Sequence, residues 1–226
     1  MKSKWNPVIF LSSLILFLGA CAPAYVPNVI NAPLLSNKGE VQLAVNTGIA
    51  GFDPQFAYAV TDHFGIMVNG SFANWTSDST DNFHKHQFFE LGTGYYTKIG
   101  SSGRFETFGG FGFGNLRADY SNDLWLSKSR VNSTRFFIQP TIGATTSIFD
   151  GSFATRIVLV ELKQDNISAS GLFVEPVLTG KVGYKYVKGV FQLGFSLPLN
   201  SNNLPFNYQP FIVSVGIQAN IGKIFE

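Results

Sequence analysis

The sequence has little charge, a single cysteine and no long apolar run after its first twenty residues. Only 13% of its 226 residues are Asp, Glu, Lys or Arg, and the formal net charge is +2. Lys2 and Lys4 near the N-terminus account for that excess, and no basic block remains that would recruit nucleic acid. After residue 20 no stretch is apolar for the roughly 20 residues that a transmembrane helix needs, so a helical membrane protein is not expected.

Glycine and aromatic residues are abundant instead. The chain contains 23 Gly and 23 Phe, and 45% of its residues are hydrophobic. Because the apolar residues are dispersed among Gly, Asn, Ser and Thr, they indicate β-structure. A length of 226 residues suits one large all-β domain.

The cysteine, Cys21, follows a segment with the three parts of a secretory signal: two lysines, an apolar core over residues 8–18 and two small residues. The stretch Leu18-Gly19-Ala20-Cys21 resembles the lipobox of bacterial lipoproteins, which are cut before the cysteine and carry a diacylglyceryl group on its sulfur. The resemblance implies that residues 1–20 are a signal peptide and that acyl chains such as palmitate on Cys21 hold the protein on a membrane. The alternative is an ordinary signal, which would leave an unpaired thiol in an oxidising compartment.

The next segment, "APAYVPNVINAPLLSN" at residues 22–37, is rich in proline and asparagine. Such a composition predicts an extended tether rather than a helix or strand. We therefore expect three parts: a signal peptide at 1–20, a lipidated tether at 21–38 and a folded domain at 39–226.

The folded domain has a hydrophobic period of two. Val41, Leu43 and Val45, for example, alternate with polar or small residues. We predict ten strands, with eight possible, in a closed antiparallel up-and-down barrel. The strands are expected at 39–47, 52–61, 64–74, 85–97, 104–117, 132–147, 152–162, 170–182, 189–198 and 207–221.

The predicted connections differ between the two ends of the barrel. Short ones ("TDH", "KIGSSG", "FDGS", "YKYVK") follow the even-numbered strands. Mostly longer, polar ones ("NWTSDSTDNFHK", "ADYSNDLWLSKSR", "KQDNIS", "NSNNLPF") follow the odd-numbered strands, apart from a short first hairpin near "NTGIAG".

Together with the lipobox and the alternation, this asymmetry resembles a small OmpA-like outer-membrane barrel, whose short turns face the periplasm. The tether is also similar to that of uncharacterised barrel lipoproteins. The resemblance implies a protein in the bacterial outer membrane that is exposed at the cell surface. Because an even number of strands returns both ends of the domain to one side, we expect the lipid on Cys21 to enter the inner leaflet.

Six charged residues lie on the small or polar face of the predicted strands. We expect them inside the barrel, where a buried charge is costly unless it is paired; they are Glu90, Glu106, Arg135, Arg156, Glu175 and Lys181. Arg156 and Glu175 are the best candidates for a pair, because they lie near the middles of neighbouring strands. A barrel of this size is largely filled by side chains, so we expect a structural role for these charges rather than catalysis.

His84 and His86 share one strand face and could together bind a metal. No nearby third ligand supports such a site, and we expect solvated residues at the rim, with no metal and no cofactor. A lipid-modifying enzyme would need one of these histidines to be hydrogen-bonded to a serine at the rim. Candidate partners are Ser77, Asp78, Ser79 and Asp81.

The leading hypothesis is an outer-membrane barrel lipoprotein that is not an enzyme. It would have a structural or surface-interaction role, with membrane lipids and an unidentified surface or periplasmic protein as partners and no nucleic acid. The main alternative is a lipid-tethered, lipocalin-like barrel that binds an apolar ligand inside. A membrane barrel places apolar residues outside and charges inside, whereas a soluble binder inverts this arrangement.

Overall fold

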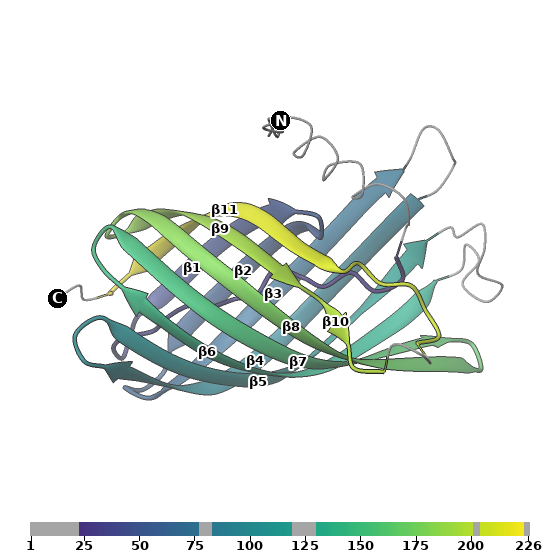
Figure 1. Cartoon of the computed structure of the whole chain (residues 1–226), viewed down its shortest axis with the longest axis horizontal. Helices are drawn as coiled ribbons and strands as arrows, with labels where there is room; N and C mark the ends of the chain where they lie inside the picture. Colours follow the sequence, from purple (N-terminus) through teal and green to yellow (C-terminus); the bar gives the residue numbers. More distant parts are fainter. Residues whose placement is uncertain (1–22, 77–82, 119–129, 201–203, 224–226) are drawn as a thin grey trace, which may run out of the picture.

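The computed structural model describes residues 23–76, 83–118, 130–200 and 204–223, which form a closed antiparallel β-barrel (Figure 1). The signal region and Cys21 lie outside the described residues. In chain order the strands are β1 (Val41–Gly48), β2 (Gly51–Ala59), β3 (Phe64–Thr76), β4 (Phe83–Ile99), β5 (Gly103–Ala118), β6 (Val131–Thr145), β7 (Phe149–Gln164), β8 (Ile167–Tyr184), β9 (Val187–Phe195), β10 (Leu197–Pro198) and β11 (Phe211–Ile221).

Each long strand pairs with the next long strand in the sequence, and β11 closes the ring on β1, where Val41 lies opposite Ile221. The two-residue β10 continues β9 beyond Ser196, and both pair with β8. The wall therefore has ten strand positions, which confirms the predicted all-β, ten-stranded antiparallel barrel. Closure pairs the backbone of every long strand on both sides.

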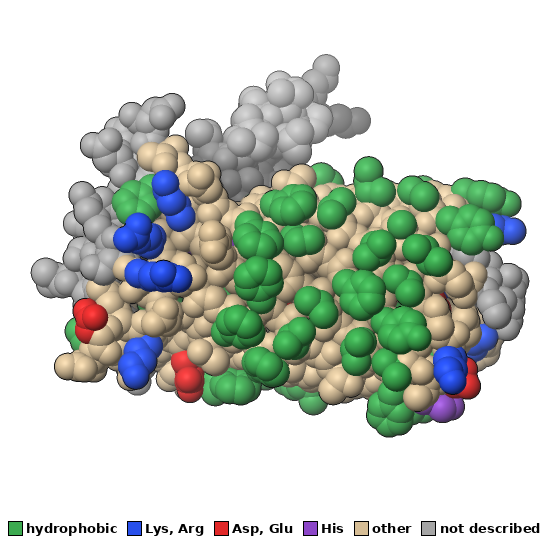
Figure 2. All heavy atoms as spheres, turned by 180° about the vertical axis from the view of Figure 1, so that it is seen from behind, with side chains coloured by type: hydrophobic (Ala, Val, Ile, Leu, Met, Phe, Trp, Pro, Cys, Tyr) green, Lys and Arg blue, Asp and Glu red, His purple; other side chains and the backbone are tan. Residues whose placement is uncertain are grey.

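The period of two sorts the side chains into an apolar outer face and an inner face on which buried polar and charged residues lie beside apolar ones such as Phe108. On β1, Leu43 and Val45 are 46% and 47% exposed, whereas Gln42 and Asn46 are both 2% exposed. Large apolar side chains are likewise exposed on the other long strands, and Figure 2 shows them spread over the middle of the outer surface. The barrel is thus inverted relative to a soluble barrel, which buries its apolar face.

The two ends of the barrel differ in their connections. At one end, here called the short-turn end, the strands are joined by residues 60–63, 100–102, 146–148 and 185–186. The other end, the long-loop end, carries the connections 77–82, 119–130 and 199–210. Two connections at the long-loop end are tight. The hairpin at Ile49–Ala50 was expected, but the predicted loop "KQDNIS" is mostly strand, with only Asp165 and Asn166 between β7 and β8.

The segment before β1 lies inside the barrel. Every residue from 23 to 36 is buried, and we call this segment the luminal strap. It enters at the long-loop end, where Ala24 N donates a hydrogen bond to Asn207 O at 2.9 Å. It leaves at the short-turn end, where Lys223 Nζ donates to Leu34 O at 2.8 Å. Figure 1 shows it as the purple trace along the barrel. The segment that we predicted to be an extended tether is therefore extended, but it runs through the lumen instead of lying outside the folded domain.

Glycines on the inner face of β5 make room for the luminal side chains. A Cβ built on Gly112 would lie 2.7 Å from both the Phe88 ring and Glu90 Cγ. On the outer face, a Cβ on Gly109 would meet only Phe137 O, at 3.6 Å.

We therefore predict that Gly112→Val destabilises the barrel by about 1–3 kcal/mol through overpacking, whereas Gly109→Val has little effect. The measurement is the temperature at which the compact barrel converts to the slower, unfolded band on a gel. Equal conversion temperatures for the two variants would contradict the packing of this face.

Candidate functional site

The luminal strap is an extended chain that cannot take part in the strand ladder. Apart from one isolated bridge between Tyr25 and Tyr208, it pairs with no strand. A buried backbone group without a partner costs free energy, so side chains must supply the hydrogen bonds of the strap beyond Tyr25, where no backbone partner is found. Carbonyl oxygens of the strap accept bonds from Arg135 (to Val26 O, 3.1 Å), Arg156 (to Asn28 O, 3.2 Å), Gln55 (to Val29 O, 2.8 Å), Gln192 (to Ile30 O, 2.6 Å), Gln139 (to Asn31 O, 2.8 Å), Lys181 (to Ala32 O, 2.7 Å) and Lys223 (to Leu34 O, 2.8 Å).

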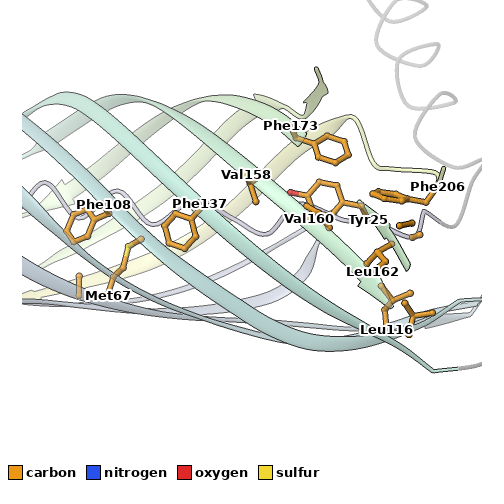
Figure 3. Close-up of a cluster of buried hydrophobic side chains, with 14 of the residues drawn as sticks. Tyr25, Met67, Phe108, Leu116, Phe137, Val158, Val160, Leu162, Phe173 and Phe206 are labelled. Carbon is orange, nitrogen blue, oxygen red and sulfur yellow. The ribbon is translucent and has the colours of Figure 1, made fainter. Parts of the chain in front are cut away.

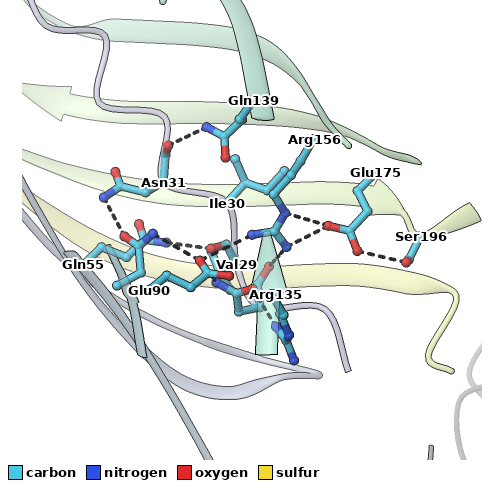
Figure 4. Close-up of polar contacts among 12 residues, drawn as sticks. Val29, Ile30, Asn31, Gln55, Glu90, Arg135, Gln139, Arg156, Glu175 and Ser196 are labelled. Carbon is cyan, nitrogen blue, oxygen red and sulfur yellow. Dashed lines mark hydrogen bonds and ion pairs between the residues drawn. The ribbon is translucent and has the colours of Figure 1, made fainter. Parts of the chain in front are cut away.

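Glutamine side chains hold the middle of the strap (Figure 4). The amide of Gln192 donates from Nε2 to Ile30 O at 2.6 Å and accepts from Ile30 N at its Oε1 at 3.1 Å. This pair of bonds copies the exchange between two hydrogen-bonded residues of an antiparallel sheet. Gln55 and Gln139 add single bonds from other sides of the lumen. The strap is therefore held from several strands at one level.

A charged network lies beside these glutamines. Arg156 is 2% exposed and contacts Glu175 Oε2 through both Nε and Nη2, at 2.7 Å each. A second carboxylate, that of Glu90, lies 3.6 Å from Arg156 Nη1. The pair expected from the sequence is thus present. Because both carboxylates also bind the strap, the network joins the wall to the strap.

Tyr25 anchors the strap near the long-loop end. Its hydroxyl donates to Glu175 Oε1 at 2.5 Å, and its ring centroid lies 4.6 Å from that of Phe173. The guanidinium carbon of Arg135 lies 4.8 Å from the centroid of the Tyr25 ring, within cation–π range. Figure 3 shows Tyr25 among Phe173, Phe206 and neighbouring apolar residues. This anchor was not identified from the sequence, in which Tyr25 belongs to a predicted tether.

A second polar cluster holds the strap at the short-turn end. Glu106 Oε1 accepts a bond from Leu35 N at 2.6 Å, and Glu40 Oε2 accepts one from Ser36 N at 2.8 Å. Arg104 Nε donates to Ser36 Oγ at 2.8 Å. The strap is thus fixed at both ends as well as in the middle.

All six charged residues selected from the sequence face the lumen and are at most 6% exposed. Each of them also bonds directly to the strap. Glu90 accepts from Asn28 Nδ2 at 2.8 Å, and the other five make the contacts given above. The sequence pattern located these charges on the inner face. It missed their main partner, although the apolar stretch "YVPNVINAPLL" is unusually hydrophobic for a solvated tether.

The two histidines are not at a solvated rim, and that expectation is wrong. His84 is 1% and His86 is 9% exposed, and their ring nitrogens Nε2 and Nδ1 lie 2.8 Å apart. His86 Nε2 lies 2.9 Å from Ser71 Oγ, so a serine–histidine hydrogen bond exists, but with a serine that was not considered. The candidate partners Ser77, Asp78, Ser79 and Asp81 lie outside the described residues. No group of three metal-ligating side chains occurs in the described ranges.

Comparison with known proteins assigns no family. No protein-family model matches the chain, and no curated protein matches its sequence. Within the described ranges no helix is long and apolar enough to cross a membrane. Any function assigned to the chain therefore rests on the geometry of its barrel and lumen.

The central ion pair provides a test of this geometry. Arg156→Ala would leave Glu175 and Glu90 buried without their cation, and breaking a buried pair costs about 3–5 kcal/mol. We predict that this variant unfolds at a clearly lower temperature in the heat-modified gel assay. Lys163→Ala, which removes an exposed cation from β7, should unfold like the wild type. An unchanged unfolding temperature for Arg156→Ala would contradict the role of the network.

Proposed function

We propose that the protein is an outer-membrane β-barrel lipoprotein with a structural or surface-interaction role, and that its luminal strap closes the barrel to solutes. The observation that carries this proposal is the combination of an apolar outer wall with a lumen filled by the chain's own N-terminal segment. A membrane barrel needs such a wall, because lipid can satisfy no polar group.

The distribution of charge supports a membrane location. The exposed charged residues described on the strands lie near the two ends, for example Lys85 and Lys163 at the long-loop end and Lys98 at the short-turn end. Between the ends the outward positions are taken by residues such as Phe111 and Ile217, which are 45% and 59% exposed. A band of this kind stabilises a barrel in hydrocarbon and would promote aggregation in water.

The lipocalin-like alternative is not favoured. A soluble binder would expose the charged set and keep an apolar cavity for its ligand. Here the charged set is buried, and the strap occupies the lumen. The cavity lined by Ala24, His84, His86 and Arg135 has a volume of about 10 Å³, which suits one water molecule.

The burial of the Ser71–His86 pair argues against a lipid-modifying enzyme. Ser71 and His86 are hydrogen-bonded, but Ser71 is only 2% exposed and lies inside the wall. A serine nucleophile must reach the ester that it attacks, and a hydroxyl group buried in this way does not reach one. We propose that Ser71, His86 and His84 form a structural chain of hydrogen bonds instead.

The direction of the strap changes the expected position of the lipid. Cys21 is two residues before Pro23, and a chain spans at most about 3.6 Å per residue. Since the strap enters at the long-loop end, an acylated Cys21 would lie at that end, while the short turns lie at the other. The lipid therefore cannot enter the inner leaflet if the short turns face the periplasm. We propose that it enters the outer leaflet and holds the entrance of the strap in place.

The anchor and the orientation can be tested together. We predict that the wild type incorporates labelled palmitate and that Cys21→Ser does not. In the Cys21→Ser background, Asp165→Cys and Lys185→Cys place single thiols in tight turns at the long-loop and short-turn ends, both at residues with positive φ. A membrane-impermeant maleimide should label Asp165→Cys on intact cells and Lys185→Cys only after lysis. A wild type without palmitate would contradict the lipoprotein, and the reverse labelling pattern would contradict the orientation.

The closed lumen can be tested by electrophysiology. In planar bilayers we expect no stepwise conductance from the wild type. Deletion of residues 24–36 should produce a conducting pore, because it leaves a polar lumen lined by charges. Heat-modifiable migration of the deleted chain serves as the control for folding. Steady conductance by the wild type would contradict a closed barrel.

A further inference from the structure

A basic pocket lies on the outer wall at the long-loop end, across β3, β4, β5 and the residue just before β6. It has a volume of about 580 Å³ and is open to the surroundings. Its cations are Lys85, Arg117 and Arg130, all exposed, and its other outward-facing side chains are Phe72, Asn74, Gln87 and Asn115. Figure 2 shows basic side chains gathered at this end, beyond the apolar band.

The three cations form a row across neighbouring strands. Lys85 and Arg117 are direct cross-strand partners, and Arg130 precedes Val131, which pairs with Leu116. Like charges placed opposite each other destabilise a sheet unless an anion bridges them. Within the described part of the chain no carboxylate forms an ion pair with any of the three. The row therefore has the geometry of an anion site that no carboxylate of the described residues fills.

An apolar groove continues from this pocket down the wall. It also has a volume of about 580 Å³ and is lined mainly by outward-facing side chains of β11, β1, β2, β3 and β4, among them Leu43, Val45, Val68, Phe89 and Ile217. Phe72 lines both the pocket and the groove. The two hollows are therefore adjacent, with cations toward the long-loop end and apolar side chains toward the middle of the barrel.

We propose that this outer face binds a phosphorylated membrane lipid, with the phosphate in the basic pocket and an acyl chain in the groove. Arginine and lysine make strong charge-assisted hydrogen bonds to phosphate oxygens. The amides of Asn74, Gln87 and Asn115 can donate to the ester or sugar oxygens of a headgroup. In a membrane, the three cations would lie at the level of the lipid headgroups in the leaflet at the long-loop end. This inference therefore rests on the membrane location proposed above.

The groove distinguishes a lipid from other anionic ligands. A soluble phosphate would use the cations alone and gain nothing from Phe72, Phe89 or Leu43. Nucleic acid binding needs many cations along a track, and here a single row ends at an apolar surface. Both remain outcomes that the experiment can reveal.

The test measures binding by the full-length protein purified in a neutral detergent. The probes are short-chain phosphatidic acid, the diacylglycerol of the same chain length, inorganic phosphate and single-stranded oligonucleotide. We expect phosphatidic acid to bind tightest. Arg117→Ala should weaken its binding by about tenfold, and the triple variant Lys85→Ala, Arg117→Ala, Arg130→Ala by at least about a hundredfold.

Matched variants separate the pocket and the groove from the rest of the wall. Lys163→Ala removes an exposed cation at the same end outside the pocket and should leave binding unchanged. Phe89→Ala in the groove should weaken phosphatidic acid but not inorganic phosphate, whereas Phe153→Ala, which is also outward-facing but outside the groove, should affect neither. Heat-modifiable migration confirms that each variant is folded.

Three results would overturn the inference: equal binding of inorganic phosphate and phosphatidic acid, tighter binding of the oligonucleotide, or equal losses in Lys163→Ala and Arg117→Ala. Because the assay is made in detergent, its failure is distinct from failure of the membrane location. A wild type that takes up palmitate and is labelled as expected, but does not select phosphatidic acid, would leave the proposed function intact and remove this site.

Discussion

The structure depends on one constraint: a backbone segment inside a closed barrel has no free strand edge to pair with. Beyond Tyr25, whose backbone bonds to Asn207 and Gln209, the hydrogen bonds of the luminal strap must then come from side chains or be lost at a cost. This explains why the lumen is lined with long polar residues. Gln192 reproduces a backbone pairing with Ile30, and lysine and arginine side chains reach carbonyls at both ends of the strap. Side chains from every long strand between β2 and β9 therefore bond to the strap.

The same constraint explains how so many charges are tolerated inside. An isolated ion pair in a dry interior gains little over its desolvation cost. Here Arg156 satisfies Glu175, Glu90 and the carbonyl of Asn28 at once, and Glu175 also accepts bonds from Tyr25 and Ser196. The strap supplies donors and acceptors that the wall alone lacks. The wall is consequently free to present apolar side chains outward, which is the arrangement that lipid requires.

The direction of the strap places its entrance and the basic row of the outer wall at the same end of the barrel. The strap enters at the end where the longer connections lie, and the row of Lys85, Arg117 and Arg130 lies at that end as well. In the proposed function, a lipid on Cys21 has a physical purpose that the barrel itself does not supply. The wall needs no second attachment, but a strap that is not paired into the sheet gains from an anchor at its entrance. Acyl chains and the cationic row would then both belong to the same leaflet.

The sequence by itself determined the strand number, the approximate strand limits and the face on which each side chain lies, because a period of two is a local property of the chain. For that reason Glu90, Arg156 and Glu175 could be assigned to the interior in advance. Only the tertiary structure decided what those charges bind. The strap at residues 23–36 has no regular period, and its partners lie up to 189 residues away in the sequence, as for Leu34 and Lys223. The histidines show the same limit, since burial of His84 and His86 depends on the strap and on neighbouring strands. Periodicity records which way a side chain points, whereas its partner is set by the closure of the barrel around its own N-terminal segment.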